Sequence, residues 1–303
     1  MQYCLCMPQP WIVVLAGGEG SRVRSITRSP DGEDVPKQFC RLLNGQSLFR
    51  TALARARRLT AEARVVPVVR AQHRRWWARD LRGIDPGLLL SQHESRGTAH
   101  AVFLALIAIA RRDPDASAVF LPSDTMIDHE DRFHGAVIRL HREAEAWNDR
   151  VMLLGAEPGA SDRDYGWIVP DEELQRGTRR VVSFVEKPPR EEARALRLRG
   201  GLVNTFVTAA RVRVLLELFR LCLPDLVAAH HGQGENFLHP TRERRTWDLS
   251  RDLLAHTTSW QRVRAVAPCG WCDLGTPDRL SRWLAEHRET FVWERPRPET
   301  VAR

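Results

Sequence analysis

The stretch Trp11-Ile12-Val13-Val14-Leu15-Ala16-Gly17-Gly18 decides the fold class of this 303-residue chain. It begins with an uninterrupted apolar run, rich in β-branched side chains, and stops at two glycines. Such a run predicts a strand that is buried on both faces, as in a parallel sheet. Similar runs predict further strands at Arg64 to Val69, Ala118 to Leu121 and Val151 to Leu154.

The segments between these strands have the length and apolar spacing of helices. They run from Ser47 to Leu59, from Gly97 to Arg111 and from Asp131 to Trp147. Strands that alternate with helices indicate βαβ units with right-handed crossovers. We therefore expect an α/β fold with a Rossmann-like mixed, mostly parallel sheet that is flanked by helices.

After Gly155 the alternation gives way to a smaller α+β part. It is expected to contain strands at Tyr165 to Val169, Val181 to Val185 and Leu202 to Val207, and helices at Arg211 to Cys222 and Asp278 to His287. No internal repeat or long linker separates the two parts, so we expect one domain over residues 9–290, with halves 9–155 and 156–290. Residues 291–303 form a tail, which is expected to fray from Glu294 because it is rich in Pro and Arg.

The net charge of +8 raises the question of nucleic-acid binding. The 46 basic residues are spread along the chain and interleaved with 38 acidic ones, which is not the pattern of a binding tail or stripe. Trp76 and Trp77, which follow Arg74 and Arg75, form a lone basic-aromatic cluster and are interpreted as a helix face. We expect no nucleic-acid partner.

Membrane insertion and disulfide bonding are not expected either. The longest apolar stretch, Ala99 to Ala110, is interrupted by His100 and is shorter than the roughly 18 residues of a membrane span. The first ten residues lack a secretory pattern, so a cytoplasmic location is expected. The six cysteines are irregularly spaced, and the pair Cys269 and Cys272 is weak evidence for zinc, so free thiols are expected.

A glycine-rich turn, Leu15-Ala16-Gly17-Gly18-Glu19-Gly20-Ser21-Arg22, follows the first strand directly. Glycines at the end of a strand let backbone N–H groups approach phosphate oxygens closely. The turn is not a P-loop, because the Gly-Lys-Ser/Thr ending is missing, and it lacks the third glycine of the dinucleotide fingerprint. An ordinary tight turn is the alternative, but three glycines before an arginine favour a phosphate cradle.

A second motif, Val35-Pro36-Lys37-Gln38-Phe39, is followed by Gly45 and Ser47-Leu48. Together with the glycine-rich turn it resembles the sugar-1-phosphate nucleotidylyltransferases, most closely the mannose-1-phosphate guanylyltransferases. The resemblance continues in order along the chain, through Glu94-Ser95-Arg96-Gly97-Thr98-Ala99, Leu121-Pro122-Ser123-Asp124, Tyr165-Gly166-Trp167-Ile168, Phe184-Val185-Glu186-Lys187-Pro188, Asn204-Thr205-Phe206 and Trp271-Cys272-Asp273-Leu274-Gly275. It implies the nucleotide-diphospho-sugar transferase fold.

The resemblance implies that Mg²⁺ is the cofactor and that two aspartates hold it. Asp124 and Asp273 stand at the matching positions. Carboxylate oxygens suit Mg²⁺, which usually keeps few protein ligands beside substrate phosphates. The structural alternatives are an N-cap of the helix near Asp131 for Asp124 and an ordinary turn residue for Asp273.

The resemblance also implies roles for the basic residues. Arg22 is expected to contact the triphosphate and the departing pyrophosphate, Lys37 the nucleotide phosphates and Lys187 the sugar phosphate. These two lysines are the only ones among the 46 basic residues, and both fall within the expected motifs. The further expected contacts are Leu15, Ala16, Gly17, Gly18, Gly20, Ser21, Gln92, Gly97 and Thr98 for the nucleotide, and Gly166, Glu186, Lys187 and Asn204 for the sugar phosphate.

The function expected from this pattern is transfer of a nucleotidyl group from GTP to mannose 1-phosphate, with release of pyrophosphate, in nucleotide-sugar and polysaccharide biosynthesis. Thr125, where the family often has His, and Thr276-Pro277, where Ser-Trp is typical, leave the choice of sugar open. Two alternatives remain at this point. One is a uridylyl- or thymidylyltransferase acting on glucose 1-phosphate, and the other is a non-catalytic nucleotide-sugar sensor. The oligomeric state considered for the protein is a homodimer.

Overall fold

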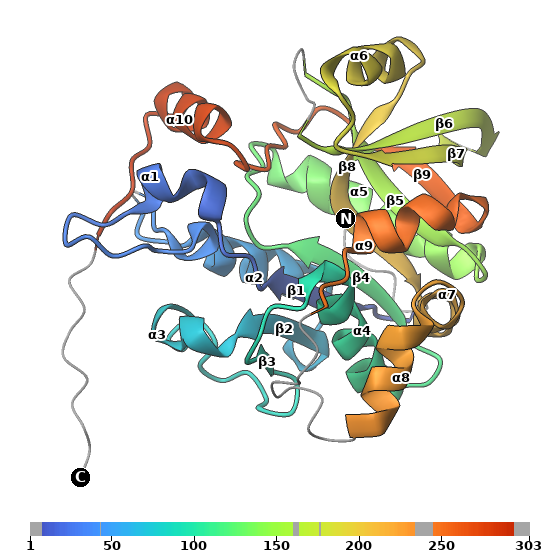
Figure 1. Ribbon diagram of the computed structural model, residues 1–303, viewed down its shortest axis with the longest axis horizontal. Coiled ribbons are helices and arrows are strands. Elements are labelled where there is room, and N and C mark those ends of the chain that lie inside the picture. Colours follow the sequence, from blue (N-terminus) through green and yellow to red (C-terminus); the bar gives the residue numbers. More distant parts are fainter. Residues whose placement is uncertain (1–7, 43, 160–163, 176, 234–244, 294–303) are drawn as a thin grey trace.

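The computed structural model describes residues 8–42, 44–159, 164–175, 177–233 and 245–293. In the first half of the chain, four parallel strands form the order β3-β2-β1-β4 (Figure 1). Their bounds are β1 Trp11–Ala16, β2 Val65–Arg70, β3 Leu90–Gln92 and β4 Ser117–Pro122. The parallel arrangement brings their carboxyl ends to one edge of the sheet, where the glycine-rich turn also lies.

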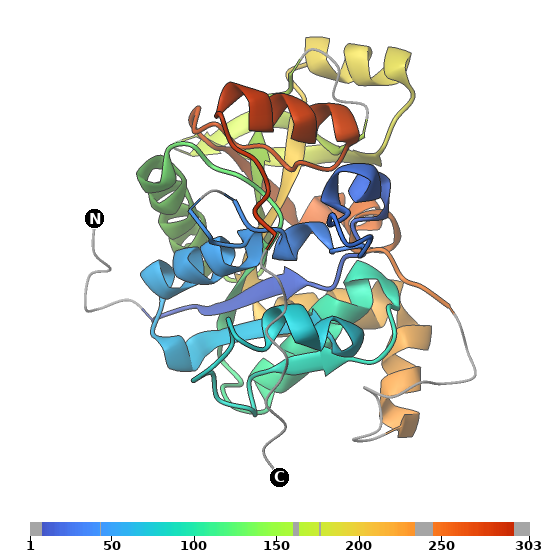
Figure 2. The same ribbon diagram turned by 90° about the vertical axis from the view of Figure 1, so that its left-hand side faces the viewer.

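Helices cover both faces of these strands. On one face lie α2 (Leu48–Leu59) and α5 (Glu130–Ala146), and on the other lie α4 (Gly97–Ala110) and α7 (Val212–Cys222) (Figures 1 and 2). Ser47 caps α2, because its hydroxyl accepts a hydrogen bond from the backbone N–H of Arg50 at 3.1 Å. The strand β1 lies between two neighbours and is almost entirely buried, as its apolar run predicted.

The second half extends the same sheet in the order β8-β5-β9-β7-β6. The strands are β5 Val151–Ala156, β6 Gly166–Gln175, β7 Thr178–Glu186, β8 Leu202–Arg211 and β9 Gln261–Ala265. Strand β8 runs antiparallel to both β4 and β5 and so joins the two halves. The remaining helices are α1 Arg24–Thr27, α3 Arg74–Trp77, α6 Arg190–Leu198, α8 Pro224–Gln233, α9 Leu249–Asp252 and α10 Pro277–Glu286.

The predicted mixed α/β sheet with flanking helices is confirmed, but the sheet is not mostly parallel. Parallel pairing joins β3, β2, β1 and β4 in the first half and β5 to β9 in the second. Strands β6, β7 and β8 pair antiparallel with their neighbours, and the short connection between β6 and β7 permits only that direction. Strand β9 was not predicted, because Arg262 and Arg264 interrupt its apolar pattern. Each of these arginines has its own partner. Arg264 pairs with Glu143, and the guanidinium of Arg262 lies 5.3 Å from the centre of the Trp147 ring.

Within the described ranges, no helix combines the length and the apolar character needed to cross a membrane. Residues 291–293, where the expected tail begins, return to the domain, since the backbone N–H of Val292 donates to the carbonyl oxygen of Arg41 at 2.8 Å. The expected fraying concerns residues 294–303, which lie outside the described residues.

Candidate active site

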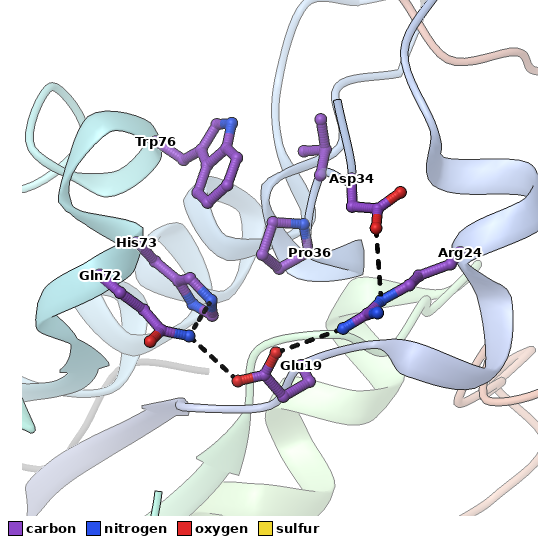
Figure 3. A pocket seen from close by; sticks show the side chains of 8 residues that line it. Glu19, Arg24, Asp34, Pro36, Gln72, His73 and Trp76 are labelled. Atoms are coloured by element: carbon purple, nitrogen blue, oxygen red, sulfur yellow. Dashed lines mark hydrogen bonds and ion pairs between the residues drawn. The ribbon is translucent and has the colours of Figure 1, made fainter. Parts of the chain in front are cut away.

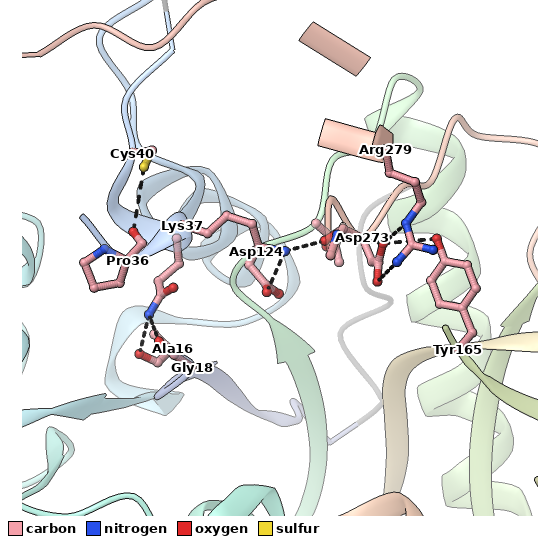
Figure 4. A network of polar contacts seen from close by, with 12 residues as sticks. Ala16, Gly18, Pro36, Lys37, Cys40, Asp124, Tyr165, Asp273 and Arg279 are labelled. Atoms are coloured by element: carbon pink, nitrogen blue, oxygen red, sulfur yellow. Dashed lines mark hydrogen bonds and ion pairs between the residues drawn. The ribbon is translucent and has the colours of Figure 1, made fainter. Parts of the chain in front are cut away.

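The glycine-rich turn packs directly against the Pro36–Phe39 motif. Gln38 is buried, and its amide nitrogen donates to the carbonyl oxygens of Ala16 at 3.1 Å and Gly18 at 2.8 Å (Figure 4). Gly20 has φ +63°, and a Cβ there would lie 2.9 Å from the backbone nitrogen of Lys37. Only glycine fits this position, because both the backbone conformation and the close approach of Lys37 exclude a side chain.

Lys37 connects the two aspartates that were predicted to bind metal. Its side chain is only 5 % exposed, and its Nζ lies 3.0 Å from Oδ2 of Asp124. The same ammonium donates to the backbone carbonyl oxygen of Asp273 at 2.5 Å. One compact cation therefore holds together two residues that are far apart in the sequence, beside the glycine-rich turn (Figure 4).

Backbone hydrogen bonds fix the loop after β4 against the segment before Asp273. Met126 and Cys272 exchange two such bonds, at 2.8 and 2.9 Å. The backbone N–H groups of Asp128 and His129 both donate to the carbonyl oxygen of Cys269, at 2.9 and 3.0 Å. These contacts make the placement of Asp124 relative to Asp273 a property of the backbone rather than of flexible side chains.

The carboxylate of Asp273 is surrounded by donors. Tyr165 donates its hydroxyl to Oδ1 at 3.0 Å, and Nε and Nη2 of Arg279 lie 2.9 Å from Oδ1 and 3.2 Å from Oδ2 (Figure 4). The guanidinium of Arg279 also lies 4.3 Å from the centre of the Tyr165 ring. Sequence reasoning missed Arg279, since an arginine in the first turn of a helix carries no motif of its own.

The structure separates the alternatives that were considered for the two aspartates. The N-cap interpretation of Asp124 is wrong, because α5 begins at Glu130 and its N-cap residue is His129. Oδ1 of Asp273 accepts the backbone N–H of Gly275 at 3.0 Å, a contact that aspartates make in turns.

The donor set fits a hard divalent cation that keeps most of its ligands from substrate or water. The side chain of Asp124 is 41 % exposed, and Lys37 is its ion-pair partner within the described residues. The described ranges contain no group of three or more His, Cys, Asp or Glu side chains placed to hold a metal ion. Two carboxylates beside the glycine-rich turn suit Mg²⁺, which often takes only one or two protein ligands.

The predicted sugar-phosphate residues gather where β6, β7 and β8 meet. A Cβ on Gly166 would lie 2.7 Å from Oε2 of Glu186, so this glycine is needed for close packing. Lys187 has φ +48°, is 45 % exposed along its side chain, and donates from Nζ to Glu186 at 2.7 Å. Its backbone N–H donates to the carbonyl oxygen of Tyr165 at 2.9 Å, which links this group to the Asp273 carboxylate.

Asn204 is buried in β8, and its side-chain oxygen accepts the backbone N–H of Phe206 at 3.0 Å. Phe206 has φ +67°, so the amide of Asn204 supports an unusual backbone conformation. The structure therefore gives Asn204 a local structural contact beside the sugar contact that the sequence predicted.

Two of the residues expected to contact the nucleotide, Gly97 and Thr98, contact a segment that the sequence did not single out. Gly97 has φ +86°, and a Cβ there would lie 2.1 Å from the carbonyl oxygen of Trp247. The hydroxyl of Thr98 accepts the backbone N–H of Leu249 at 2.8 Å. The side-chain nitrogen of Gln92 lies 2.7 Å from Nδ1 of His100, and burial lowers the pKa of His100 to about 3.

Arg22 is exposed at the open side of the turn, in the short 3-10 helix Ser21–Val23. It makes no hydrogen bond or ion pair with another residue in the described part of the chain. A guanidinium in this position is available for an anionic ligand.

A pocket of about 190 Å³ opens beside the other side of the turn (Figure 3). Glu19 is held there by Gln72 at 3.1 Å and by Arg24 at 3.6 Å. Burial, followed by the charges of Arg70 and Arg75, lowers the pKa of His73 in this pocket to about 4. None of the residues that line this pocket is among the predicted catalytic, metal-binding or substrate-binding residues.

Comparisons with known proteins identify the family of this chain. The family model described as nucleotidyl transferase matches residues 12–289. The chain is 32 % identical over 178 residues to the xanthan biosynthesis protein XanB of Xanthomonas campestris pv. campestris, covering 58 % of this chain and 36 % of that protein. It is 29 % identical over 231 residues to a mannose-1-phosphate guanylyltransferase of Escherichia coli, covering 72 % of this chain and 46 % of that protein.

A solved structure described as mannose-1-phosphate geranyltransferase from Thermus thermophilus superposes with a TM-score of 0.74. The two chains are 26 % identical, and the match covers 88 % of this chain and 77 % of the other. The chain spans less than half of the length of the two curated relatives. A family match that extends from β1 to beyond α10, over the same residues that form the candidate site, shows that the chain belongs to the nucleotidyl transferase family.

Proposed function

We propose that this protein transfers a nucleotidyl group from GTP to mannose 1-phosphate, releasing pyrophosphate and forming a nucleotide sugar. The observation that carries the proposal is the Lys37 ammonium, which joins Asp124 and Asp273 at the edge of the glycine-rich turn. The similarity to XanB and to a mannose-1-phosphate guanylyltransferase supports the choice of sugar and base.

Members of the nucleotidyl transferase family generally use a divalent metal ion. We propose Mg²⁺, held by Asp124 and Asp273. When bound, it would neutralise negative charge on the triphosphate. The fixed backbone contacts between Met126 and Cys272 would keep the two carboxylates in place for it.

The triphosphate is proposed to bind at the carboxyl end of β1, within the half formed by residues 9–155. Backbone N–H groups of the turn would bind phosphate oxygens, and Lys37 would add a buried positive charge. Arg22 would bind the departing pyrophosphate from the open side. The nucleotide contacts proposed are Leu15, Ala16, Gly17, Gly18, Gly20, Ser21, Gln92, Gly97 and Thr98.

The sugar 1-phosphate is proposed to bind in the half formed by residues 156–290. Lys187 is partly exposed and would bind the phosphate, while Glu186 and Asn204 would accept or donate hydrogen bonds to sugar hydroxyls. Gly166 would allow close approach of the sugar to the backbone. The task of the protein is then to place the sugar phosphate oxygen in line with the α-phosphorus, because nucleotidyl transfer needs little covalent chemistry from the enzyme.

Purified protein with Mg²⁺ and a panel of nucleoside triphosphates and sugar 1-phosphates tests the proposal through pyrophosphate release. We expect the highest kcat/KM with GTP and mannose 1-phosphate, and no turnover for Asp124→Asn under the same conditions. Preference for UTP or dTTP with glucose 1-phosphate would replace the proposed substrates. Binding of a nucleotide sugar without any pyrophosphate release would instead identify a non-catalytic sensor.

The cellular location and the oligomeric state of the protein are also part of the proposal. A cytoplasmic location is supported by the phosphorylated substrates proposed here, and a homodimer by the prevalence of symmetric dimers among oligomers. Fractionation of cells and light scattering of the purified protein test these two points separately.

A further inference from the structure

Arg70 lies at the end of β2, between the glycine-rich turn and Gln92. It is aligned with Gln92 in the parallel pairing of β2 and β3. A Cβ built on Gly17 would lie 3.4 Å from Oε1 of Gln92 and 3.9 Å from Cγ of Arg70. The two side chains therefore lie together beneath Gly17, and they are 7 % and 3 % exposed.

Gln92 presents a hydrogen-bond acceptor towards Gly17. Its side-chain nitrogen lies 2.7 Å from Nδ1 of His100, and an amide NH₂ group can only donate, so Nδ1 accepts. Because the pKa of His100 is about 3, its ring is neutral at pH 7, which agrees with this assignment. The remaining polar atom, Oε1, is the one that lies near Gly17.

The guanidinium of Arg70 supplies donors beside the same turn. Its Nη1 forms an ion pair with Glu19 of the glycine-rich turn. Its Nε is buried and has no hydrogen-bond partner within the described residues. A buried guanidinium donor without a partner is costly unless a ligand satisfies it, because a desolvated donor loses its hydrogen bonds to water.

We propose that Arg70 and Gln92 read the base of the nucleotide and select guanine; this inference rests on the proposed function. Guanine offers a donor at N1 and acceptors at O6 and N7. Oε1 of Gln92 matches the donor, and the guanidinium of Arg70 matches the acceptors, as arginine does when it binds guanine in other complexes. Glu19 then acts as a positioning residue, because it fixes the guanidinium through the turn.

The same pair disfavours the other bases. Uracil and thymine also place an acceptor, O4, beside their N3–H donor, but C5 carries no acceptor in the position of guanine N7, so part of the guanidinium stays unsatisfied. Adenine and cytosine carry an amino group where guanine and uracil carry an acceptor. That amino donor would face the donors of Arg70. An unpaired buried polar group is the strongest source of discrimination in such sites.

Arg70→Lys tests the inference, because lysine keeps the charge but loses the planar pair of donors. The measurements are kcat/KM with GTP, UTP, dTTP and ATP, and the calorimetric Kd of each triphosphate in the presence of Mg²⁺. We expect wild-type protein to prefer GTP, and Arg70→Lys to reduce that preference roughly tenfold to hundredfold by weakening GTP alone. Arg64→Lys, just before the other end of β2, is the matched control and should leave the preference unchanged.

Glu19→Gln separates positioning from base contact. It should weaken binding of all triphosphates through the turn and lower the GTP preference less than Arg70→Lys does. An equal loss for every triphosphate in Arg70→Lys would overturn the inference, and so would a wild-type preference for UTP or dTTP. Both results leave nucleotidyl transfer itself intact. Absence of pyrophosphate release with every triphosphate would contradict the proposed function. The Kd values would still decide whether Arg70 selects guanine.

Discussion

The Nζ atom of Lys37 lies 3.0 Å from Oδ2 of Asp124, in a position where the lysine side chain is almost fully buried. The same atom contacts the backbone of Asp273 at 2.5 Å. A buried ammonium with two oxygen partners is stabilised by both, and removing it leaves a carboxylate without its counter-charge. The contact therefore couples the stability of the site to its proposed chemistry.

Lys37→Arg is expected to lower kcat roughly a hundredfold, because the larger guanidinium cannot occupy the buried space between Asp124 and Asp273. Overpacking should also lower the free energy of unfolding by about 1–3 kcal/mol. Lys187→Arg is the comparison, since that side chain is 45 % exposed, and its melting temperature should be unchanged. Kinetics of pyrophosphate release and thermal unfolding measure both effects. A wild-type kcat for Lys37→Arg would show that Lys37 is not part of the proposed site.

Asp273→Asn removes the carboxylate that faces Arg279. Turnover should fall by about two orders of magnitude or more, as the proposed metal loses a ligand. The free energy of unfolding should fall by about 1–3 kcal/mol, because Arg279 is left partly buried without its ion pair. Asp278→Asn, an exposed change in the first turn of α10, is the matched control for both measurements. If Asp273→Asn retains near-normal turnover, Asp273 is not a metal ligand.

Chelation provides a test of the cofactor that needs no mutation. Treatment with EDTA should abolish pyrophosphate release, and added Mg²⁺ should restore it. Because Mg²⁺ is proposed to be held by only two carboxylates beside the substrate phosphates, its apparent affinity should rise when triphosphate is present. Activity that survives exhaustive chelation would contradict a metal-dependent reaction.

Gly97→Ala should destabilise the protein by about 2 kcal/mol or more, since the new Cβ would meet the carbonyl oxygen of Trp247 and φ is +86°. Asparagine tolerates a positive φ but carries the same Cβ, so Gly97→Asn should be no better. Gly135→Ala, within helix α5, is the control and should stabilise by about 0.5–1 kcal/mol. Chemical denaturation gives all three values. Equal stability of Gly97→Ala and wild type would show that the Trp247 segment does not pack there.

Buried histidines predict a loss of stability in acid. Burial, followed by the charges of Arg211 and Arg142, lowers the pKa of His141 from 6.5 to about 4, and Nε2 of its ring lies 2.7 Å from the Ser117 hydroxyl. Between these two pH values the unfolded chain binds a proton that the folded protein excludes. The stabilising contribution is therefore complete above pH 6.5 and is lost as the pH falls towards 4.

His141→Gln should reduce the slope of unfolding free energy against pH, near pH 5, by about 1.4 kcal/mol per pH unit. The control is His256→Asn, at an exposed position. Denaturant titrations between pH 4 and pH 7 measure the slope. An unchanged slope in His141→Gln would mean that His141 has the same pKa in the folded and the unfolded protein.

The sequence by itself determined three of the four parallel strands of the first half, β1, β2 and β4, and the set of motif residues, whereas the three-residue strand β3 was not predicted. The Trp11–Ala16 run and the glycines after it are local signals, because a doubly buried strand needs apolar side chains at consecutive positions and a close-packed turn needs glycine. The two lysines were also recognisable from the sequence alone, since both stand inside motifs of a chain that otherwise uses arginine.

Only the tertiary structure decided which distant residues complete the site. Arg279 faces Asp273, Arg70 lies beneath Gly17, and Trp247 closes over Gly97, and none of these contacts leaves a trace in local composition. Strand β9 forms despite its arginines because Glu143 and Trp147 lie opposite them. Such contacts depend on how elements pack across the sheet, so a side chain's partner is set by the fold and not by its neighbours in the chain.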